Sequence, residues 1–454
     1  MSAPLVSVCI PSAGHGAYVA GAVASALGQG VDELEVLVHI DGEDDARDPA
    51  ISDPRVRCRR HPRQIGVAAN RNSLVAAARG RYIAWLDADD VYLPGSLAAR
   101  VELLEANPAV ALAHGAARIV DADGVAMAQW RRPFDRGVVE SGPAAFAELA
   151  LANELTTSTV VARRSAHLAA GAFRSFGPSS SDWEMWLRLA LQGDVAYVAG
   201  EVACYRQHAS TISRSTPPLR RLACDVRAVR SGLRAAAGVH GRPAIARRAH
   251  AALAARALLQ ARDLRLRGDR IAAVRALRRA AWLSPRPVSR HLPALLTAVA
   301  RDDEPAAHRT TRVVLRRIAD LLEGTRYGAV VAAASASDPV WDATLVRIAA
   351  AVRDVTPAAA VVATVTKWDP TLLSLCARDG RQFPDRRLLP EGYPADGAAA
   401  VAHLDRLVAD GLTHLVLPRA WSWWLERYDG FASRLGAAAH TDDDCLIYRL
   451  APPR

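Results

Sequence analysis

The stretch Tyr82-Ile83-Ala84-Trp85-Leu86-Asp87-Ala88-Asp89-Asp90 places three carboxylates directly after an apolar run. The apolar run has the composition of a buried β-strand. Three acids this close together repel one another, and a fold tolerates them most readily when a cation or a basic partner neutralises them. Carboxylate ligands of this kind favour Mg²⁺ or Mn²⁺. The alternative is a solvated acidic turn that caps a helix expected near Pro94.

Around this stretch, up to about Ser215, strand patterns alternate with helical apolar spacing. The expected strands are Val6 to Ile10, Glu35 to Ile40, Val56 to Arg59, Tyr82 to Leu86 and Val110 to His114. The expected helices are Tyr18 to Leu27, Val67 to Ala78 and Leu97 to Ala106. This alternation predicts an α/β fold with a mostly parallel sheet, which binds ligands at the carboxyl ends of its strands.

Five sequence blocks stand in a fixed order in this region. They are Val6 to Pro11, Ala24 to Gln29, Leu34 to Val38 with Asp41-Gly42 after it, Gly66 to Asn72, and Ala78 to Asp90. In this order and spacing they resemble the opening of family 2 glycosyltransferases, over roughly the first 215 residues. The resemblance implies the GT-A fold and transfer of a sugar, with inversion, from a nucleotide-diphosphate donor to an acceptor hydroxyl.

The resemblance also implies a set of donor-binding residues at the strand ends. By this resemblance Asp41 would contact the nucleobase. The ribose and the metal-bound diphosphate would be served by Asp87, Asp89 and Asp90, with Pro11 and Ser12 beside the nucleotide. Arg71 would either contact the phosphates or brace the acidic loop. The alternative for Asp41 is a strand-end turn residue before Gly42.

Two departures from the family pattern fall where the base and ribose bind. The second strand ends in His39-Ile40-Asp41-Gly42-Glu43 in place of the common Asp-Asp-Gly-Ser, and Ser12-Ala13-Gly14 replaces Thr-Tyr-Asn. The identity of the nucleotide therefore stays open.

A second group of acids lies in Ser179-Ser180-Ser181-Asp182-Trp183-Glu184-Met185-Trp186-Leu187-Arg188, at the start of an amphipathic helix. Inverting transfer needs a base that takes the proton of the acceptor hydroxyl, and a carboxylate in a cleft suits this role. The family pattern places that base at Asp182, and Glu184 would position the base or the acceptor. The alternative for Asp182 is a helix N-cap.

The block Tyr205-Arg206-Gln207-His208 matches the Tyr-Arg-x-His of many family members. An arginine can hold diphosphate oxygens and an imidazole can complete a metal shell. Arg206 is therefore a candidate phosphate ligand and His208 a candidate metal ligand. A structural hydrogen-bonding role is the alternative for His208.

Three domains are expected: residues 1–216, a helical linker domain at 217–304, and a smaller C-terminal α/β domain at 305–454. A helical hairpin is predicted from Ala244 to Arg267 and from Arg270 to Leu283, with a turn at Gly268-Asp269 and a proline stop at Ser284-Pro285. The hairpin is expected to be a helical spacer or a dimer-forming bundle. It faintly resembles one tetratricopeptide repeat, but no second copy follows at a fixed period. The expected linker after it is Asp302-Asp303-Glu304-Pro305.

The C-terminal domain is expected to contain strands at Gly328 to Ala334, Leu412 to Leu417 and Cys445 to Leu450, and a helix at Ala398 to Asp410. Its aromatic run is Trp421, Trp423, Trp424 and Tyr428. This run is expected to anchor a helix to the domain's own core, and stacking on a sugar is the alternative.

Composition narrows the protein class. The net charge of +10 comes almost wholly from arginine. Binding of a phosphorylated substrate or of an anionic membrane face would explain this charge as well as binding of nucleic acid would. Nucleic acid is not expected as a partner. The six cysteines form no C-x-x-C pair and are expected to be reduced. With no signal-peptide pattern and no apolar stretch of membrane-spanning length, a cytoplasmic protein is expected. Peripheral contact with the inner face of the membrane and a homodimer stay open.

The resulting hypothesis is a nucleotide-sugar-dependent, hexosyltransferase-type enzyme acting on a glycan, a lipid-linked acceptor or a secondary metabolite, as in polysaccharide biosynthesis. One rival is a nucleotidyltransferase, which is disfavoured because the loop at 12–16 has no arginine or lysine after it. The other rival is a non-catalytic carbohydrate-binding or assembly module. The presence of Asp87, Asp89 and Asp182 argues against this second rival, because a non-catalytic module would not need these acids.

Overall fold

The computed structural model describes residues 3–13, 16–42, 53–130, 138–208, 211–266, 269–301, 304–335, 339–365, 372, 376, 378–384 and 394–451. Several predicted features lie outside these residues, namely the loop residues Gly14 and His15, Glu43, the turn residue Gly268 and the linker acids Asp302 and Asp303. Contacts divide the chain into two compact units. The first comprises Met1–Ala257, Ala280–Pro285 and Ile318–Val331, and the second comprises Leu258–Arg279, Arg286–Arg317 and Ala332–Arg454.

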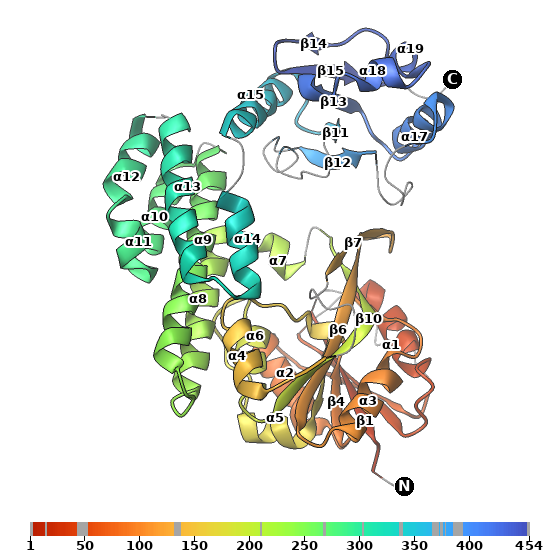
Figure 1. The fold of residues 1–454 in the computed structure, drawn as a ribbon. Coiled ribbons are helices and arrows are strands. Elements are labelled where there is room, and N and C mark those ends of the chain that lie inside the picture. The colour runs from red at the N-terminus through yellow and green to blue at the C-terminus, as the bar shows by residue number, and fades with distance from the viewer. Residues whose placement is uncertain are drawn as a thin grey trace. The chain divides into compact units, whose positions relative to one another are not determined.

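The first unit contains a large, mostly parallel sheet (Figure 1). Its main path runs β3-β2-β1-β4-β9-β6-β10-β5. These strands are β1 (Val6–Ser12), β2 (Leu34–Ile40), β3 (Val56–Arg60), β4 (Tyr82–Trp85), β5 (Val91–Tyr92), β6 (Val110–Val120), β9 (Val161–Arg163) and β10 (Asp194–Arg206), while β7 (Ala126–Trp130) pairs with β6 and β8 (Val138–Glu140) with β10. The pairs joining β1, β2, β3 and β4 and the pair of β6 with β10 are parallel. The five strands expected in this half are confirmed.

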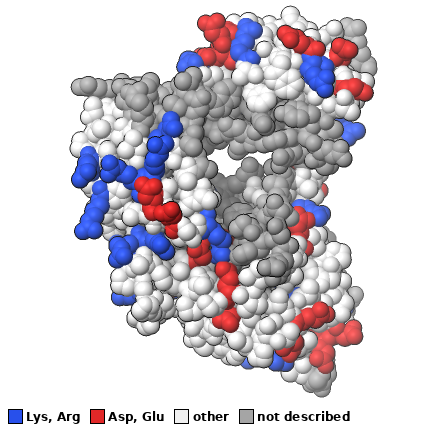
Figure 2. Space-filling model, viewed as in Figure 1, with Lys and Arg blue, Asp and Glu red and all other residues white. Residues whose placement is uncertain are grey.

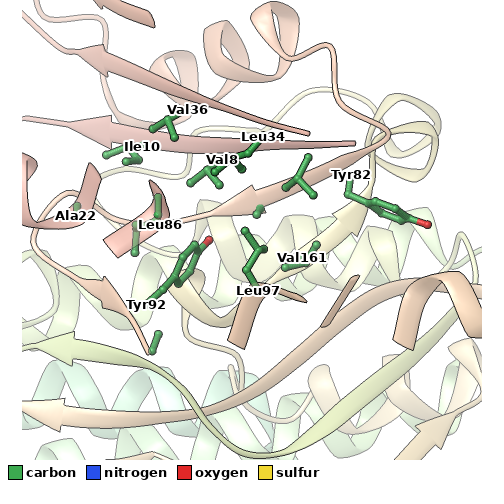
Figure 3. Close-up of a cluster of buried hydrophobic side chains, with 14 of the residues drawn as sticks. Val8, Ile10, Ala22, Leu34, Val36, Tyr82, Leu86, Tyr92, Leu97 and Val161 are labelled. Atoms are coloured by element: carbon green, nitrogen blue, oxygen red, sulfur yellow. The ribbon is translucent and has the colours of Figure 1, made fainter. Parts of the chain in front are cut away.

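Helices cover this sheet, so its central strands are buried along their whole length. The helices of this half are α1 (Gly16–Leu27), α2 (Val67–Ala77), α3 (Ser96–Ala106), α4 (Gly142–Leu149), α5 (Arg164–Ala170), α6 (Ser181–Leu189), α7 (Ile212–Ser215) and α8 (Pro218–Ala235), of which α1 to α5 contact the strands. Val8 and Ile10 of β1 pack into one cluster with Ala22 of α1 and Leu97 of α3 (Figure 3). Because side chains alternate along a strand, Ser7 and Cys9 face the other side and are buried there.

The middle of the chain is helical, as expected. The helices of this region are α9 (Arg242–Leu266), α10 (Arg270–Leu283), α11 (Pro285–Ser289), α12 (Leu292–Arg301), α13 (Glu304–Leu321), α14 (Arg326–Ser335) and α15 (Pro339–Val355). The predicted hairpin is present as α9 and α10. The strand expected at Gly328 to Ala334 is wrong, because these residues belong to α14. A short apolar run does not distinguish strand from helix, and its alanines favour the helix. The expected linker at 302–305 is followed by further helices, since Glu304 and Pro305 begin α13.

The second unit contains the smaller sheet, of order β12-β11-β13-β15-β14. Its elements are β11 (Val361–Val365), β12 (Asp379–Phe383), α17 (Gly397–Ala409), β13 (His414–Pro418), α18 (Trp424–Arg427), α19 (Phe431–Leu435), β14 (His440–Thr441) and β15 (Cys445–Arg449). The strands expected near Leu412 and Cys445 and the helix near Ala398 are confirmed. Trp424 and Tyr428 are core residues, as predicted, whereas Trp423 remains partly exposed. Among the helices of the described residues, none has the length and apolar character to cross a bilayer.

Candidate active site

The acidic loop begins where β4 ends, next to the carboxyl end of β1. The backbone N–H of Asp87 donates to Ser158 Oγ at 3.0 Å, and that of Asp90 donates to the Asp87 carbonyl at 3.0 Å. The Tyr92 hydroxyl donates to the Trp85 carbonyl at 2.6 Å. These bonds fix the loop at the edge of the sheet where the sequence predicted ligand binding.

Asp87 lies at the centre of a group of polar residues. Arg71 Nη2 donates to Asp87 Oδ1 at 3.2 Å and lies 3.4 Å from Thr157 Oγ1, while Arg71 Nη1 lies 3.4 Å from Ser181 Oγ. Burial raises the pKa of Asp87, and repulsion from Asp89 and Asp182 adds to the rise, against the lowering effect of Arg71. A bound cation would relieve this repulsion. The bracing role predicted for Arg71 agrees with these contacts.

Asp182 lies in the first turn of α6 and joins this group. Its Oδ2 accepts a hydrogen bond from Thr157 Oγ1 at 3.3 Å, and the side chain is partly exposed. The alternative that Asp182 caps the helix is wrong, because Ser180 occupies the N-cap position and no side-chain cap bond is present there. A carboxylate that is not used as a cap stays available to a ligand.

Asp89 meets His208 on the other side of the loop. His208 Nε2 lies 3.0 Å from Asp89 Oδ2, although the two residues are 119 positions apart in the sequence. The imidazole stacks on Tyr18 with ring centroids 5.5 Å apart. A carboxylate and an imidazole held this close, with Asp87 nearby, are suitable ligands for a divalent cation.

Asp90 and Arg206 form contacts within the loop itself. Asp90 is buried, and its carboxylate accepts from Ser158 Oγ at 2.5 Å and from the Arg206 N–H at 2.8 Å. Burial raises the pKa of Asp90 well above its usual range. The Arg206 guanidinium donates to the carbonyls of Asp89 and Ala122 at 2.9 and 2.8 Å. In this structure both residues brace the loop, so their predicted roles as metal and phosphate ligands stay predictions.

Asp41 directly follows β2 and holds the turn that precedes α2. Its two carboxylate oxygens accept from the N–H groups of Ile65 and Gly66 at 2.6 and 2.9 Å. The Asp41 N–H donates to the Ser12 carbonyl at 2.8 Å, next to Pro11 in β1. Asp41 thus has the turn role named as its alternative, and its contact with a nucleobase stays a prediction.

Glu184 has the environment of a structural residue. The side chain is fully buried, Arg188 Nη2 lies 2.7 Å from Oε2, and Arg174 Nη1 lies 3.0 Å from Oε1. Ser231 Oγ donates to Oε1 at 2.8 Å. Because its oxygens are occupied inside the protein, Glu184 does not face the group around Asp87, contrary to the positioning role expected of it.

Glu184→Gln should therefore lower the free energy of unfolding by about 3 kcal/mol, because Arg188 would be left buried without its countercharge. Urea unfolding would measure the change, with Glu102→Gln as a control at an exposed acid. A Glu184→Gln protein of unchanged stability that has lost activity would instead restore Glu184 to the catalytic group.

Helix α6 packs closely against α8. A Cβ at Gly232 would lie 2.6 Å from Leu187 Cδ1, so only glycine fits there without a shift. Ser180 Oγ donates to Asp225 Oδ1 of α8 at 2.6 Å, and Arg256 Nη1 lies 3.0 Å from Asp225 Oδ2. The helix that carries Asp182 is thereby fixed to the helix that follows the sheet.

The sequence did not identify the hydroxyl residues of this site. Thr157 and Ser158 lie in a single 3-10 turn, Thr157–Thr159, that contacts the acidic loop and Asp182. The signal available was the run Thr156-Thr157-Ser158-Thr159 before a strand, which has no periodicity. Among the described residues, His440, Asp442 and Cys445 of the second unit form a group whose ligand atoms lie within 4.8 Å of one another, close enough to share a metal ion. There Asp442 Oδ1 already accepts from the N–H groups of Asp444 and Cys445, as in a hairpin turn.

The chain is similar to a known protein family, to individual proteins and to solved structures. The model of the family described as "Glycosyl transferase family 2" matches residues 7–147. An uncharacterized protein, MT1568, from Mycobacterium tuberculosis (strain CDC 1551 / Oshkosh) is 30% identical over 237 residues, covering 49% of this chain and 73% of that protein. A chondroitin synthase of Pasteurella multocida (strain Pm70) is 34% identical over 126 residues, covering 27% of this chain but only 13% of the synthase. The crystal structure of S. aureus TarS 1–349 in complex with UDP-GlcNAc is similar with a TM-score of 0.46 and 15% identity, covering 69% of this chain and 92% of that one.

Proposed function

Because this chain belongs to glycosyl transferase family 2, we propose that it transfers a sugar from a nucleoside diphosphate to an acceptor hydroxyl, with inversion at the anomeric carbon. The observation that carries the proposal is the convergence of Asp87, Asp89 and Asp182 at the carboxyl edge of the sheet. Such a group of carboxylates suits a site that binds a cation and, beside it, an acceptor with a reacting hydroxyl.

A divalent ion would be held by Asp89 and His208, with Asp87 as the adjacent carboxylate. This set of mostly oxygen ligands fits Mg²⁺ or Mn²⁺. When bound, the ion would supply positive charge that stabilises the departing diphosphate. Arg71, fixed beside Asp87, would add a permanent positive charge close to the same groups.

Asp182 is the proposed base. Its carboxylate would accept the proton of the acceptor hydroxyl while that oxygen forms a bond to the anomeric carbon and the bond to the diphosphate breaks. Thr157 would orient the carboxylate through its hydrogen bond to Oδ2. A positioned base of this kind contributes a factor of about 10² to 10⁴ to the rate.

The acceptor class to screen first is a glycan. This choice rests on the match to a chondroitin synthase, which includes only a small part of that enzyme. A lipid-linked acceptor is the second class, since both would present a sugar hydroxyl to Asp182.

Calorimetric titration with UDP, GDP and dTDP, in Mn²⁺ and then in EDTA, tests the proposal. One nucleotide should bind with a Kd in the micromolar to millimolar range in Mn²⁺, roughly the range of enzyme substrates, and EDTA should abolish that binding. Absence of binding by all three nucleotides and their sugar conjugates would contradict the proposal and favour a non-catalytic module.

A further inference from the structure

The positive charge of the chain is concentrated in one helical segment. Residues 218–290 contain eighteen arginines and three aspartates, with no lysine or glutamate. The excess of fifteen positive charges is larger than the +10 of the whole chain, so the rest of the protein is net acidic. Arginine is frequent in the rest of the chain as well, but there the acids outnumber the basic residues, so the net positive charge is local to this segment.

Helix α8 presents part of this charge as a continuous face. Arg220, Arg227, Arg230 and Arg234 are all exposed, and their spacings of seven, three and four residues place them on one side of the helix. The face is about 21 Å long, from the helical rise of the residues between its ends. The single acid of α8, Asp225, lies on the buried side, where it pairs with Arg256. Arginines over the helical region appear in blue in Figure 2.

An exposed tryptophan lies beside this arginine face. Trp282, at the end of α10, is 51% exposed, and the Arg230 guanidinium lies 4.1 Å from its ring centroid. Burying an indole ring is favourable, so one that stays half in water is suited to a partner with an apolar layer. In membranes, tryptophan favours the level of the lipid headgroups, while arginine pairs with lipid phosphates.

We propose that the arginine face of α8, defined as Arg220, Arg227, Arg230 and Arg234, docks together with Trp282 on an anionic phospholipid surface. Charge complementarity accounts for the arginines, and the shallow apolar zone of a bilayer accounts for the indole. A nucleic acid would also neutralise the arginines, but its backbone offers no apolar layer to Trp282. The proposal does not depend on the chemistry at Asp182, because none of these residues touches that site.

Vesicle co-sedimentation tests the proposal with the full chain. The protein should bind vesicles of phosphatidylcholine with 30% phosphatidylglycerol and should not bind vesicles of phosphatidylcholine alone. Arg227→Gln/Arg230→Gln/Arg234→Gln should weaken binding to the anionic vesicles on the order of 100-fold, from the contribution of each arginine near such a surface. Trp282→Ala alone should also weaken binding to the anionic vesicles, but the dependence of that binding on salt should stay the same.

A control variant removes equal charge elsewhere. Arg406→Gln/Arg419→Gln/Arg427→Gln changes three exposed arginines of the second unit and should bind anionic vesicles as the unchanged protein does. Urea unfolding of both triple variants would verify that they fold. Equal losses in the two triple variants would show a nonspecific charge effect, and binding of an oligonucleotide without any binding of anionic vesicles would assign the face to nucleic acid. Either result would overturn the proposal.

Discussion

Asp182→Asn should slow sugar transfer on the order of 10³-fold or more, while the Kd of the nucleotide donor stays within a factor of about two. The amide has nearly the shape of the carboxylate, but it cannot take the proton from the acceptor hydroxyl. Donor binding should survive because Asp89 and Arg71 are unchanged. Single-turnover rates with a saturating donor, together with calorimetry of the nucleotide, would separate the two effects.

Thr157→Val is the matched variant for this experiment. It removes the hydroxyl that donates to Asp182 Oδ2 but keeps the carboxylate and the shape of the side chain. The expected loss of rate is about fivefold, since one orienting hydrogen bond contributes on the order of 1 kcal/mol. If Asp182→Asn lost donor binding as well as rate, Asp182 would have a binding role and the assignment of the base would be wrong.

Asp89→Asn should abolish metal-dependent nucleotide binding and lower kcat/KM on the order of 10³-fold. A neutral amide is a weaker ligand for a hard cation than a carboxylate, and His208 would also lose its charged neighbour. The loss of several kcal/mol of transition-state stabilisation that the metal supplies corresponds to a factor of this size. Calorimetry of the nucleotide in Mn²⁺ and in EDTA would show equal, weak binding for this variant.

Asp123→Asn is the control for Asp89→Asn, because Asp123 is an exposed acid of the nearby loop after β6 and its substitution removes the same charge. It should bind the nucleotide normally. Normal Mn²⁺-dependent binding by Asp89→Asn would move the metal to other residues and leave Asp89 a structural partner of His208.

The sheet could be predicted from the sequence because its signals are local. The buried strands β1, β2 and β4 are short, mostly apolar runs, and a polar residue or an acid ends each strand or follows it within two residues, namely Ser12, Asp41 and Asp87. Gly328 to Ala334 was predicted wrongly for the same local reason, since a run of valine and alanine suits either a buried strand or a helix.

The candidate site could be predicted only in part, because much of it depends on contacts between distant residues. The acids were recognisable from their positions after strands and at a helix start. The pairing of Asp89 with His208 and the contact of Thr157 with Asp182 follow from how β10 and the 3-10 turn pack, and no local pattern encodes them. Glu184 was assigned by its closeness in sequence to Asp182, but its side chain lies among Arg188, Arg174 and Ser231.

The contact at Gly232 has a consequence for how the protein would approach a surface. With no side chain between α8 and Leu187, the helix that bears the arginines packs directly against the helix that bears Asp182. If α8 rests on a bilayer, the tilt and height of Asp182 above the lipid plane would then be constant from one molecule to the next. An acceptor anchored in that plane would need only to diffuse laterally to meet it, a search in two dimensions instead of three.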